Sequence, residues 1–327
     1  MKLSVIGAGA WGTALALTFA ADHEVSLLAI DEAEASPLIR DRENRRFLPG
    51  IRLPESMRIA HGTDGLDAAD LILVVTPVAA LRDVLSKLVR VAPDKPFLWA
   101  CKGLEPNSSA LPHQVVAEAY GNASCGVLSG PSFAIEVARG MPAAVCLASN
   151  DAEFARRYAE KLSNQRLRIY GSDDLVGVEV AGAVKNVLAI AAGVCDGLGL
   201  GLNARAALLT RGLAEIARFG MALGARRETF MGLAGMGDVI LTCTGDLSRN
   251  RQVGLALAKG QALKEIVASL GHVAEGVGTA AEVVRRSARL QLEMPIAEAV
   301  QALLEGRLKP TEAVAHLMAR ETKFEQV

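Results

Sequence analysis

A lysine stands in the middle of a helix that the sequence predicts to be apolar on every side. Residues 179–195 read EVAGAVKNVLAIAAGVC, and the residues three or four positions from Lys185 are all small or apolar. A helix of this kind is usually buried, and burial disfavours the charged form of an unpaired lysine. Such a lysine is suited to act as a general base towards an alcohol. The alternative is a lysine whose stem is buried while its ammonium group reaches the surface.

Two further stretches carry polar groups in unusual places. Asp238 follows the glycine-rich GLAGMG and precedes an apolar run, where a carboxylate can cap a helix or pair with a buried lysine. The sequence SRNR then makes Ser248 a candidate N-cap, with Arg249, Asn250 and Arg251 in the first helical turn. Arginine is disfavoured at a helix N-terminus by the helix dipole, but together with free N–H groups it fits a phosphate. An exposed polar helix start would explain the same pattern.

A glycine-rich turn at the N-terminus has the spacing of a dinucleotide-binding motif. Gly7, Gly9 and Gly12 form G-x-G-x-x-G directly after the predicted strand 2–6, and Asp31 ends the next predicted strand. In this context the first glycine permits the tight turn, the second lets the backbone approach a pyrophosphate, and the third lets helix and strand pack closely. The pattern favours NAD or NADP, with FAD and a turn that binds no ligand as alternatives.

The elements around these residues indicate two domains. Short apolar runs predict strands at 2–6, 23–31, 71–77, 96–103, 125–129, 143–148 and 167–172. Their alternation with helical stretches predicts βαβ units and a parallel sheet. After about residue 177 the pattern predicts helices only, at 179–196, 204–223, 250–259, 261–270, 278–289, 295–305 and 310–319. We therefore predict an α/β fold: an N-terminal Rossmann-type doubly wound sheet domain, 1–178, that binds the dinucleotide, followed by an all-α substrate-binding domain, 179–327.

Composition excludes several classes of protein. The 35 basic and 36 acidic residues balance, and no basic block stands out, which argues against a nucleic-acid partner. The longest apolar runs are too short to span a bilayer, and early glycines and charges interrupt any signal peptide. The five cysteines form no C-x-x-C pair, which predicts free thiols in a reducing cytoplasm and no metal site.

These stretches, taken together, resemble the NAD(P)-dependent sn-glycerol 3-phosphate dehydrogenase family over nearly the whole chain. The matching blocks, in order, are GAGAWGTALA (7–16), NRRFLPG (44–50), WACKGLE (99–105), LSGPSFAIEVARGMP (128–142), GAVKNVLAI (182–190), NARAALLTRGLAE (203–215), GLAGMGDVILTC (232–243), SRNR (248–251), VAEGVGT (273–279) and EMPI (293–296). The resemblance implies an oxidoreductase that interconverts sn-glycerol 3-phosphate and dihydroxyacetone phosphate by hydride transfer with NAD(P), supplying the glycerophospholipid precursor.

The same resemblance implies roles for individual residues. Lys185 would take the proton from the C2 hydroxyl, oriented by Asp238 and Thr242, and Lys102 would contact the substrate beside the nicotinamide. The remaining substrate-binding residues would be Gly130, Ser132, Ser248, Arg249 and Asn250. The cofactor-binding set would be Gly7, Gly9, Ala10, Trp11, Gly12, Asp31, Lys102, Ala134, Arg249, Val273 and Glu275.

One departure from the family bears on the choice of cofactor. The family often has an arginine or histidine after the second strand, where it can meet a 2′-phosphate, but here Ile30 stands there with Asp31 beside it. An acid at this place can accept both ribose hydroxyls of NAD, so we predict a slight preference for NAD. The alternative for Asp31 is a solvated turn residue that caps the next helix. The alternatives to the main function are another two-domain dehydrogenase acting on hydroxy acids or hydroxyacyl groups, and a non-catalytic NAD-binding module. The sequence is compatible with a homodimer.

Overall fold

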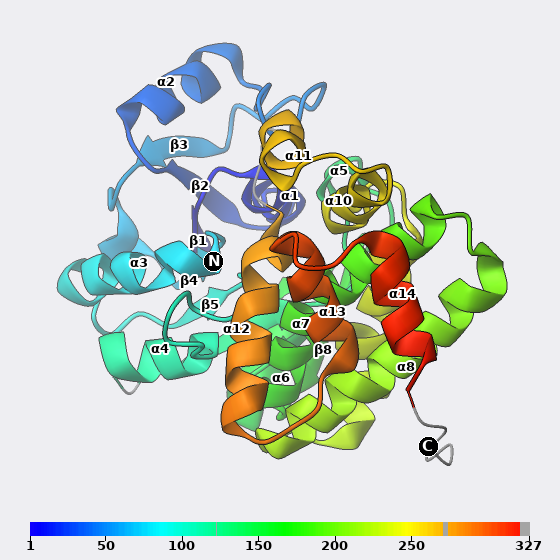
Figure 1. Ribbon diagram of the computed structural model, residues 1–327. Coiled ribbons are helices and arrows are strands. Elements are labelled where there is room, and N and C mark those ends of the chain that lie inside the picture. Colours follow the sequence, from blue (N-terminus) through cyan, green and yellow to red (C-terminus); the bar gives the residue numbers. More distant parts are fainter. Residues whose placement is uncertain (122, 271–273, 321–327) are drawn as a thin grey trace. The chain divides into compact units, whose positions relative to one another are not determined.

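The computed structural model describes residues 1–121, 123–270 and 274–320 (Figure 1). The chain forms two compact units, one made of residues 1–102 and 112–175 and the other of residues 103–111 and 176–327. The chain passes from the first unit into the second for the last time between residues 175 and 176, near the predicted domain boundary at 178. The segment 103–111, however, belongs to the helical unit rather than to the sheet unit, because Leu104 and Leu111 pack into the helical core.

The first unit is built on one sheet of eight strands in the described part of the chain, ordered β3-β2-β1-β4-β5-β6-β7-β8. All seven predicted strands are present, and the short polar edge strand β3 is additional. The strands are β1 (Lys2–Ile6), β2 (Glu24–Ala29), β3 (Arg58–His61), β4 (Leu71–Val74), β5 (Phe97–Trp99), β6 (Cys125–Ser129), β7 (Ala143–Ala148) and β8 (Leu167–Ser172). Because β1 lies between β2 and β4, the strand order reverses beside it, which is where open α/β sheets bind dinucleotides.

The prediction of a parallel sheet is wrong at one pairing, because β6 and β7 pair antiparallel while the other neighbouring strands are parallel. A parallel return needs a crossover that carries the chain back along the sheet. The connection from β6 to β7 holds only the five-residue helix α5 (Ala134–Ala138), which packs on α1 (Ala10–Phe19). The other helices of this unit are α2 (Glu32–Asp41), α3 (Val78–Val91), α4 (Pro112–Ala119) and α6 (Ala152–Leu162).

The second unit surrounds one central helix, α7 (Leu175–Gly197), with shorter helices (Figure 1). These are α8 (Gly201–Ala222), α9 (Asp238–Thr244), α10 (Arg249–Ala258), α11 (Leu263–Leu270), α12 (Glu275–Arg289), α13 (Pro295–Leu304) and α14 (Pro310–Met318). Helix α7 is longer than predicted, and by length and composition alone it could cross a membrane. Its most apolar window is 89% buried inside the structure, as in the core helix of a globular protein.

Glycines allow α7, α10 and α12 to approach at backbone distance. A Cβ on Gly193 would lie 2.0 Å from the carbonyl oxygen of Arg251, and one on Gly254 would lie 2.0 Å from that of Ile190. At the start of α12, a Cβ on Gly276 would lie 2.6 Å from the carbonyl oxygen of Asn186. Side chains larger than hydrogen are excluded at these three contacts. The spacing of the three helices is therefore fixed by their backbones.

Candidate active site

The buried lysine has two polar partners in the helical unit. Lys185 on α7 is 6% exposed, and its Nζ donates to Oδ1 of Asp238 at 2.5 Å and to Oγ1 of Thr242 at 2.7 Å. The Thr242 hydroxyl also lies 3.3 Å from Oδ1 of Asp238. Asp238 and Thr242 are one helical turn apart on α9, so both face the same ammonium group. The alternative of a lysine that reaches the surface is therefore wrong.

The glycine-rich turn before α9 delivers Asp238 to this position. Residues Leu233–Gly237 form a π-helical turn that runs directly into α9, and a Cβ on Gly235 would lie 2.2 Å from the carbonyl oxygen of Phe230. The turn is therefore pressed onto the buried Phe230. Asp238 is the first residue of α9, and Gly237, which has no side chain to cap the helix, occupies the N-cap. The pattern alone allowed Asp238 to be a helix cap, but its carboxylate instead accepts from Lys185.

Burial and pairing act in opposite directions on the Lys185 ammonium. Removal from water disfavours the charge, whereas the Asp238 carboxylate, only 1% exposed, favours it. Cys243, the neighbour of Thr242, is fully buried, and this burial raises the pKa of its thiol to about 12. The thiol is consequently neutral near pH 7 and is no nucleophile. The groups at this site that can exchange a proton with a bound alcohol are the ammonium and its oxygen partners.

Beside the lysine, a buried amide network joins three helices. Asn250 of α10 donates to Oδ1 of Asn186 at 2.9 Å and accepts from the backbone N–H of Gly276 at 3.0 Å. Asn186 in turn donates to Oε2 of Glu275 at 3.3 Å. Of these residues, Asn250 and Glu275 belong to the predicted site, whereas Asn186 does not, although it adjoins Lys185 in the same apolar helix. The signal in the sequence that could have identified Asn186 is that it is a second polar residue in a helix predicted to be apolar.

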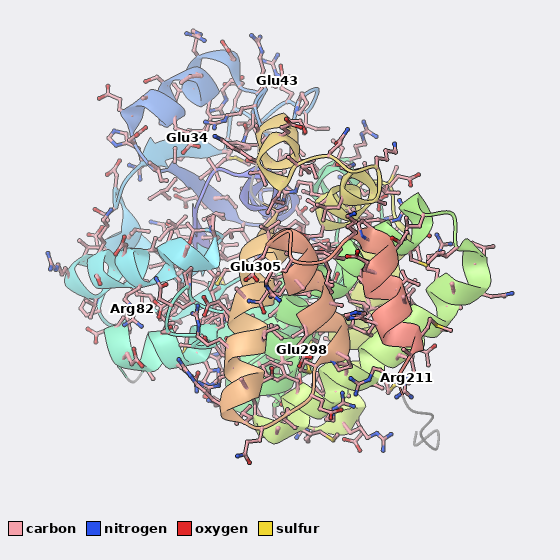
Figure 2. All side chains as sticks on the ribbon, viewed as in Figure 1. Glu34, Glu43, Arg82, Arg211, Glu298 and Glu305 are labelled. Atoms are coloured by element: carbon pink, nitrogen blue, oxygen red, sulfur yellow. The ribbon has the colours of Figure 1, made fainter. Side chains whose placement is uncertain are left out.

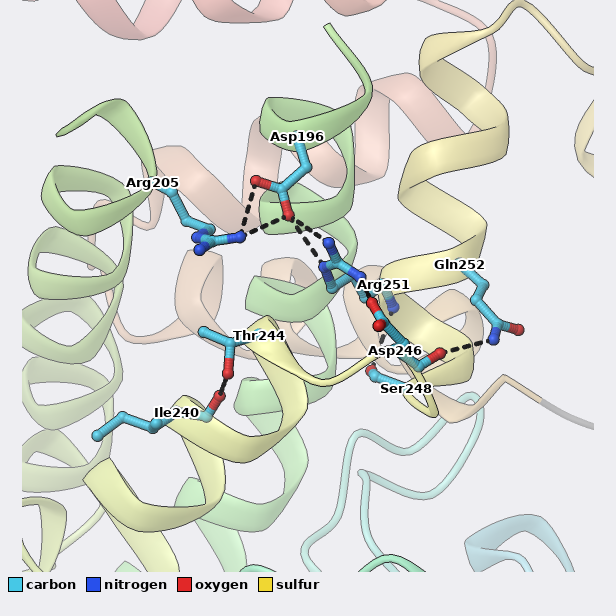
Figure 3. A network of polar contacts seen from close by, with 8 residues as sticks. All are labelled: Asp196, Arg205, Ile240, Thr244, Asp246, Ser248, Arg251 and Gln252. Carbon is cyan, nitrogen blue, oxygen red and sulfur yellow. Dashed lines mark hydrogen bonds and ion pairs between the residues drawn. The ribbon is translucent and has the colours of Figure 1, made fainter. Parts of the chain in front are cut away.

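The start of α10 has the predicted cap. The Ser248 side chain accepts from the N–H of Arg251 at 3.3 Å, so Ser248 is the N-cap. Arg249 is exposed, but Arg251 is largely buried and donates to Oδ2 of Asp196 from Nε at 2.9 Å and from Nη2 at 2.8 Å. Figure 3 shows Arg251 held between Asp196 and Asp246, with Arg205 on the far side of Asp196. Of the two arginines in SRNR, Arg251 fixes the helix and Arg249 faces solvent.

In the sheet unit, the glycine motif adopts the geometry of a dinucleotide turn. Gly7 has a φ of 110°, which side-chain-bearing residues rarely adopt, and a Cβ on Gly12 would lie 1.9 Å from the carbonyl oxygen of Gly7. A Cβ on Gly9, by contrast, would meet nothing within 4 Å. The protein itself thus requires Gly7 and Gly12. Gly9 leaves backbone open beside the N-terminus of α1, as close approach of a pyrophosphate needs.

A residue outside the predicted set braces this turn. Asn44 is 2% exposed, and its Nδ2 donates to the carbonyl oxygen of Ala8 at 2.8 Å and to Oγ1 of Thr13 at 2.8 Å. Its Oδ1 accepts from the N–H of Phe47 at 3.2 Å. Asn44 opens the block NRRFLPG, one of the stretches that carry the family resemblance, but the residue type alone does not reveal this contact.

Two sets of predicted residues come together in the sheet unit, one of three residues after β5 and β6 and one of two residues on α1 and α5. The Lys102 ammonium donates to the carbonyl oxygen of Gly130 at 3.3 Å, and the Ser132 hydroxyl donates to the same oxygen at 3.1 Å. Trp11 and Ala134, in α1 and α5, pack against one small apolar cluster. The structure therefore gathers one group of predicted residues in each unit, around Lys102 in the first and around Lys185 in the second.

Asp31 caps the helix that follows β2. Its Oδ1 accepts from the N–H of Glu34 at 2.9 Å, and Oε2 of Glu34 accepts from the N–H of Ile30 at 2.9 Å. Figure 2 labels Glu34 in the first turn of α2. The carboxyl end of β2 thus carries two carboxylates and the exposed side chain of Ile30. Val273, also in the predicted cofactor set, lies outside the described residues.

The fold, the glycine turn and the buried Lys185–Asp238 pair together define a class of protein. A glycine turn at the reversal point of a Rossmann-type sheet, joined to a helical unit with a buried lysine–carboxylate pair, is typical of dehydrogenases that use a nicotinamide dinucleotide. Across the described residues no group of three or more histidine, cysteine or acidic side chains is arranged to hold a metal ion.

Comparison with known proteins gives the family. The model of the NAD-dependent glycerol-3-phosphate dehydrogenase N-terminus matches residues 2–155, and that of its C-terminus matches residues 174–315. The chain belongs to the NAD-dependent glycerol-3-phosphate dehydrogenase family.

Individual relatives agree with this assignment. Proteins named glycerol-3-phosphate dehydrogenase (NAD(P)+) from Dechloromonas aromatica and Aromatoleum aromaticum are each 60% identical to it, and the alignments cover 99% of this chain and 99% and 100% of theirs. The crystal structure of glycerol-3-phosphate dehydrogenase from Coxiella burnetii superposes with a TM-score of 0.94 at 40% identity, covering 98% of this chain and 99% of that one. The family and the fold class that the sequence predicts are confirmed.

Proposed function

We propose that this protein interconverts sn-glycerol 3-phosphate and dihydroxyacetone phosphate with NAD(P) as the hydride carrier. Family membership supports the reaction, and the observation that carries the assignment to particular residues is the buried Lys185–Asp238–Thr242 cluster. The residues three and four positions from Lys185 on α7 are small or apolar, so this part of the helix has no structural need for the ion pair. A buried pair costs desolvation energy for both ions, so its presence favours a chemical role.

In this proposal Lys185 exchanges a proton with the oxygen on C2. In the reducing direction its ammonium donates a hydrogen bond to the ketone and then a proton to the forming alkoxide. In the oxidising direction the amine takes the hydroxyl proton. Asp238 and Thr242 hold Nζ in place through bonds of 2.5 and 2.7 Å. The carboxylate also stabilises the ammonium product of the oxidation step.

The phosphate of the substrate is assigned to the start of α10. Ser248 caps this helix, Asn250 is buried, and Arg249 is exposed beside the helix N-terminus. Free N–H groups, the positive end of the helix dipole and a guanidinium fork together match a phosphate dianion. Binding the phosphate away from C2 orients the reacting carbon, which is how remote binding energy lowers the barrier.

The residues of the sheet unit fit a dinucleotide. The open backbone at Gly9, next to the start of α1, suits a pyrophosphate, and Ala10, Trp11, Ala134 and the Lys102 group complete the assigned contacts. Bound nicotinamide supplies or accepts the hydride. Lys102 is assigned to the substrate beside it, where a second cation polarises the C2 oxygen. Glu275 and Arg249, from the helical unit, are assigned as further cofactor contacts.

The assay that tests the function is oxidation of NADH in the presence of dihydroxyacetone phosphate, followed by nicotinamide absorbance. Turnover with dihydroxyacetone phosphate supports the proposal. Binding of NADH without turnover would indicate a non-catalytic module, and turnover only with unphosphorylated 2-keto acids would indicate another dehydrogenase.

In the cell we assign the protein to the cytoplasm, where it would supply the glycerol phosphate backbone of phospholipids. A homodimer is compatible with this role.

We further infer a preference for NAD(H) over NADP(H) from the end of β2. Asp31 and Glu34 place two carboxylates there, where a 2′-phosphate would be repelled. The downstream arginines that could offset this charge have other partners. Arg42 donates to the carbonyl oxygens of Pro54 and Met57, acidic side chains pair with Arg40 and Arg45, and the Arg46 guanidinium lies 4.8 Å from the centre of the Phe47 ring.

The expected result is a kcat/KM for NADH about fivefold to several hundredfold above that for NADPH, at one fixed concentration of dihydroxyacetone phosphate. Two anions a few Å apart at a partly solvated site repel by about 1–4 kcal/mol. Asp31→Asn, which keeps a capping side chain, should narrow the ratio by improving NADPH. Lys259→Met, an exposed change in the helical unit, is the control that should leave the ratio unchanged. A tenfold advantage of NADPH in the unmodified protein would contradict this inference.

A further inference from the structure

A buried carboxylate on α12 holds the segment that follows Lys102. Oε1 of Glu282 accepts from the N–H of Asn107 at 3.0 Å, and Oε2 accepts from the Ser109 hydroxyl at 2.6 Å. Glu282 is 6% exposed and Ser109 is fully buried. Two helical turns after Glu282, Arg289 donates to the carbonyl oxygen of Ser108 at 3.2 Å. We call the contacts of Glu282 with Asn107 and Ser109 the Glu282 clasp.

The clasp holds backbone that would not take this shape by itself. Asn107 has a φ of 70° and Ser109 a φ of 58°, both in the left-handed region. Asparagine adopts this region more readily than other side-chain-bearing residues, but it costs a serine about 1 kcal/mol or more. Two such residues within one loop persist only where the surroundings determine them, and they cluster at functional sites. Here the N–H of one and the hydroxyl of the other bond the same carboxylate.

The clasped loop is coupled to the residues next to Lys102. The N–H of Ser109 donates to the carbonyl oxygen of Glu105 at 3.0 Å, and the N–H of Glu105 donates to that of Ala110 at 2.8 Å. Leu104 is buried in the helical core, and Gly103 has a φ of 132°. From Lys102 the chain therefore enters a loop whose first residues are fixed by burial and by two backbone bonds.

The same face of α12 also reaches the amide network of the other group. Glu275 and Glu282 are seven residues apart, about two helical turns and about 10 Å along the axis, so they lie on one face. Glu275 accepts from Asn186, next to Lys185, and the N–H of Gly276 donates to Asn250. One rigid helix thus bonds the neighbour of Lys185 at its start and the segment after Lys102 in its middle.

We propose that the Glu282 clasp is a positioning device for Lys102, which sets the ammonium for the reacting substrate through the segment 103–111. Neither Glu282 nor Ser109 touches the substrate in this account. The inference rests on the function proposed above and on the assignment of Lys102 to the substrate. Its physical basis is that a misplacement of about 1 Å in a catalytic group can cost about 100-fold in rate.

The test compares two buried serines. Ser109→Ala removes one bond of the clasp, whereas Ser287→Ala, the control, removes a hydroxyl on α12 that is 1% exposed and donates to the carbonyl oxygen of Val284. We expect Ser109→Ala to lower kcat/KM for dihydroxyacetone phosphate about tenfold, with the dissociation constant of NADH unchanged. Ser287→Ala should leave kcat/KM within twofold of the unmodified enzyme.

A double-mutant cycle shows whether the effect passes through Lys102. In a Lys102→Met background, adding Ser109→Ala should cause no further loss, because the group that it positions is gone. If the two losses instead multiply, or if Ser109→Ala lowers only the melting temperature and leaves kcat/KM unchanged, the clasp is merely structural and the proposal is wrong. Should Ser109→Ala fold poorly, Glu282→Gln, which is similar in size, repeats the cycle. Arg285→Gln is then its control, because Glu282 also accepts from Arg285 at 2.8 and 2.7 Å. Absence of turnover in the unmodified enzyme would contradict the proposed function instead.

Discussion

Replacing Lys185 with methionine is expected to lower kcat for dihydroxyacetone phosphate by about 100-fold to 10,000-fold, the usual cost of losing a general acid–base group. The side chain would keep its volume on the buried face of α7 but lose the ammonium that bonds Asp238 and Thr242. Binding of NADH should persist, because the glycine turn lies in the other unit. The measurements are steady-state turnover and a fluorescence titration with NADH.

Stability must be separated from chemistry in this experiment. Lys185→Met leaves the Asp238 carboxylate buried without its cation, which typically costs about 3–5 kcal/mol. Adding Asp238→Asn removes the stranded charge, so the double variant should recover much of the melting temperature and none of the turnover. Lys259→Met, at an exposed lysine after α10, serves as the matched control. A Lys185→Met protein that keeps most of its kcat would refute the assignment.

Replacing Arg249 with alanine is expected to raise KM for dihydroxyacetone phosphate by roughly 30-fold to several thousand-fold. Truncating one partner of a charge-assisted contact that is buried in a complex costs roughly 2–5 kcal/mol. Arg249 is exposed at the start of α10, so its removal should leave the melting temperature nearly unchanged. Arg251→Ala should instead lower stability, because Arg251 is the buried partner of Asp196 (Figure 3).

Unphosphorylated dihydroxyacetone provides the control substrate for Arg249→Ala. If Arg249 binds phosphate, the unmodified enzyme and the variant should use dihydroxyacetone equally poorly, and the difference between them should appear only with the phosphorylated ketone. The dissociation constant of NADH should change less than KM. An unchanged KM for dihydroxyacetone phosphate would place the phosphate site elsewhere.

The sequence predicts the parts of the fold that depend on local pattern. The strands around Gly7, the cap at Ser248 and the burial of Lys185 follow from apolar periodicity and residue type. The antiparallel pairing of β7 was not predictable, because it depends on where the five-residue α5 packs rather than on the strand sequences. The short edge strand β3 was not predicted, because its four residues, RIAH, show no apolar run or alternation long enough to indicate a strand.

The contacts that arrange the predicted residues were harder to see. Asn44 and Glu282 are ordinary polar residues in their local sequence, and their partners lie 36 and 173 residues away in the chain. Residue type could likewise not decide whether Asp238 caps α9 or pairs with Lys185, since both fit a carboxylate after glycines. Only the tertiary packing of α7 against α9 distinguishes the two.

Residues 103–111 lie within the sequence of the sheet unit but pack in the helical unit, and this limits where the chain could be cut into two fragments. A fragment that began at residue 176 would lack Leu104 and Leu111, both 2% exposed in the helical core. Each missing leucine would leave a cavity, and such a cavity lowers the free energy of unfolding by about 2–5 kcal/mol. Its Glu282 would also lose Asn107 and Ser109 as partners. We therefore expect the isolated helical half to be unstable, and gene fusions or split versions of the enzyme to succeed only where this nine-residue piece travels with the C-terminal half.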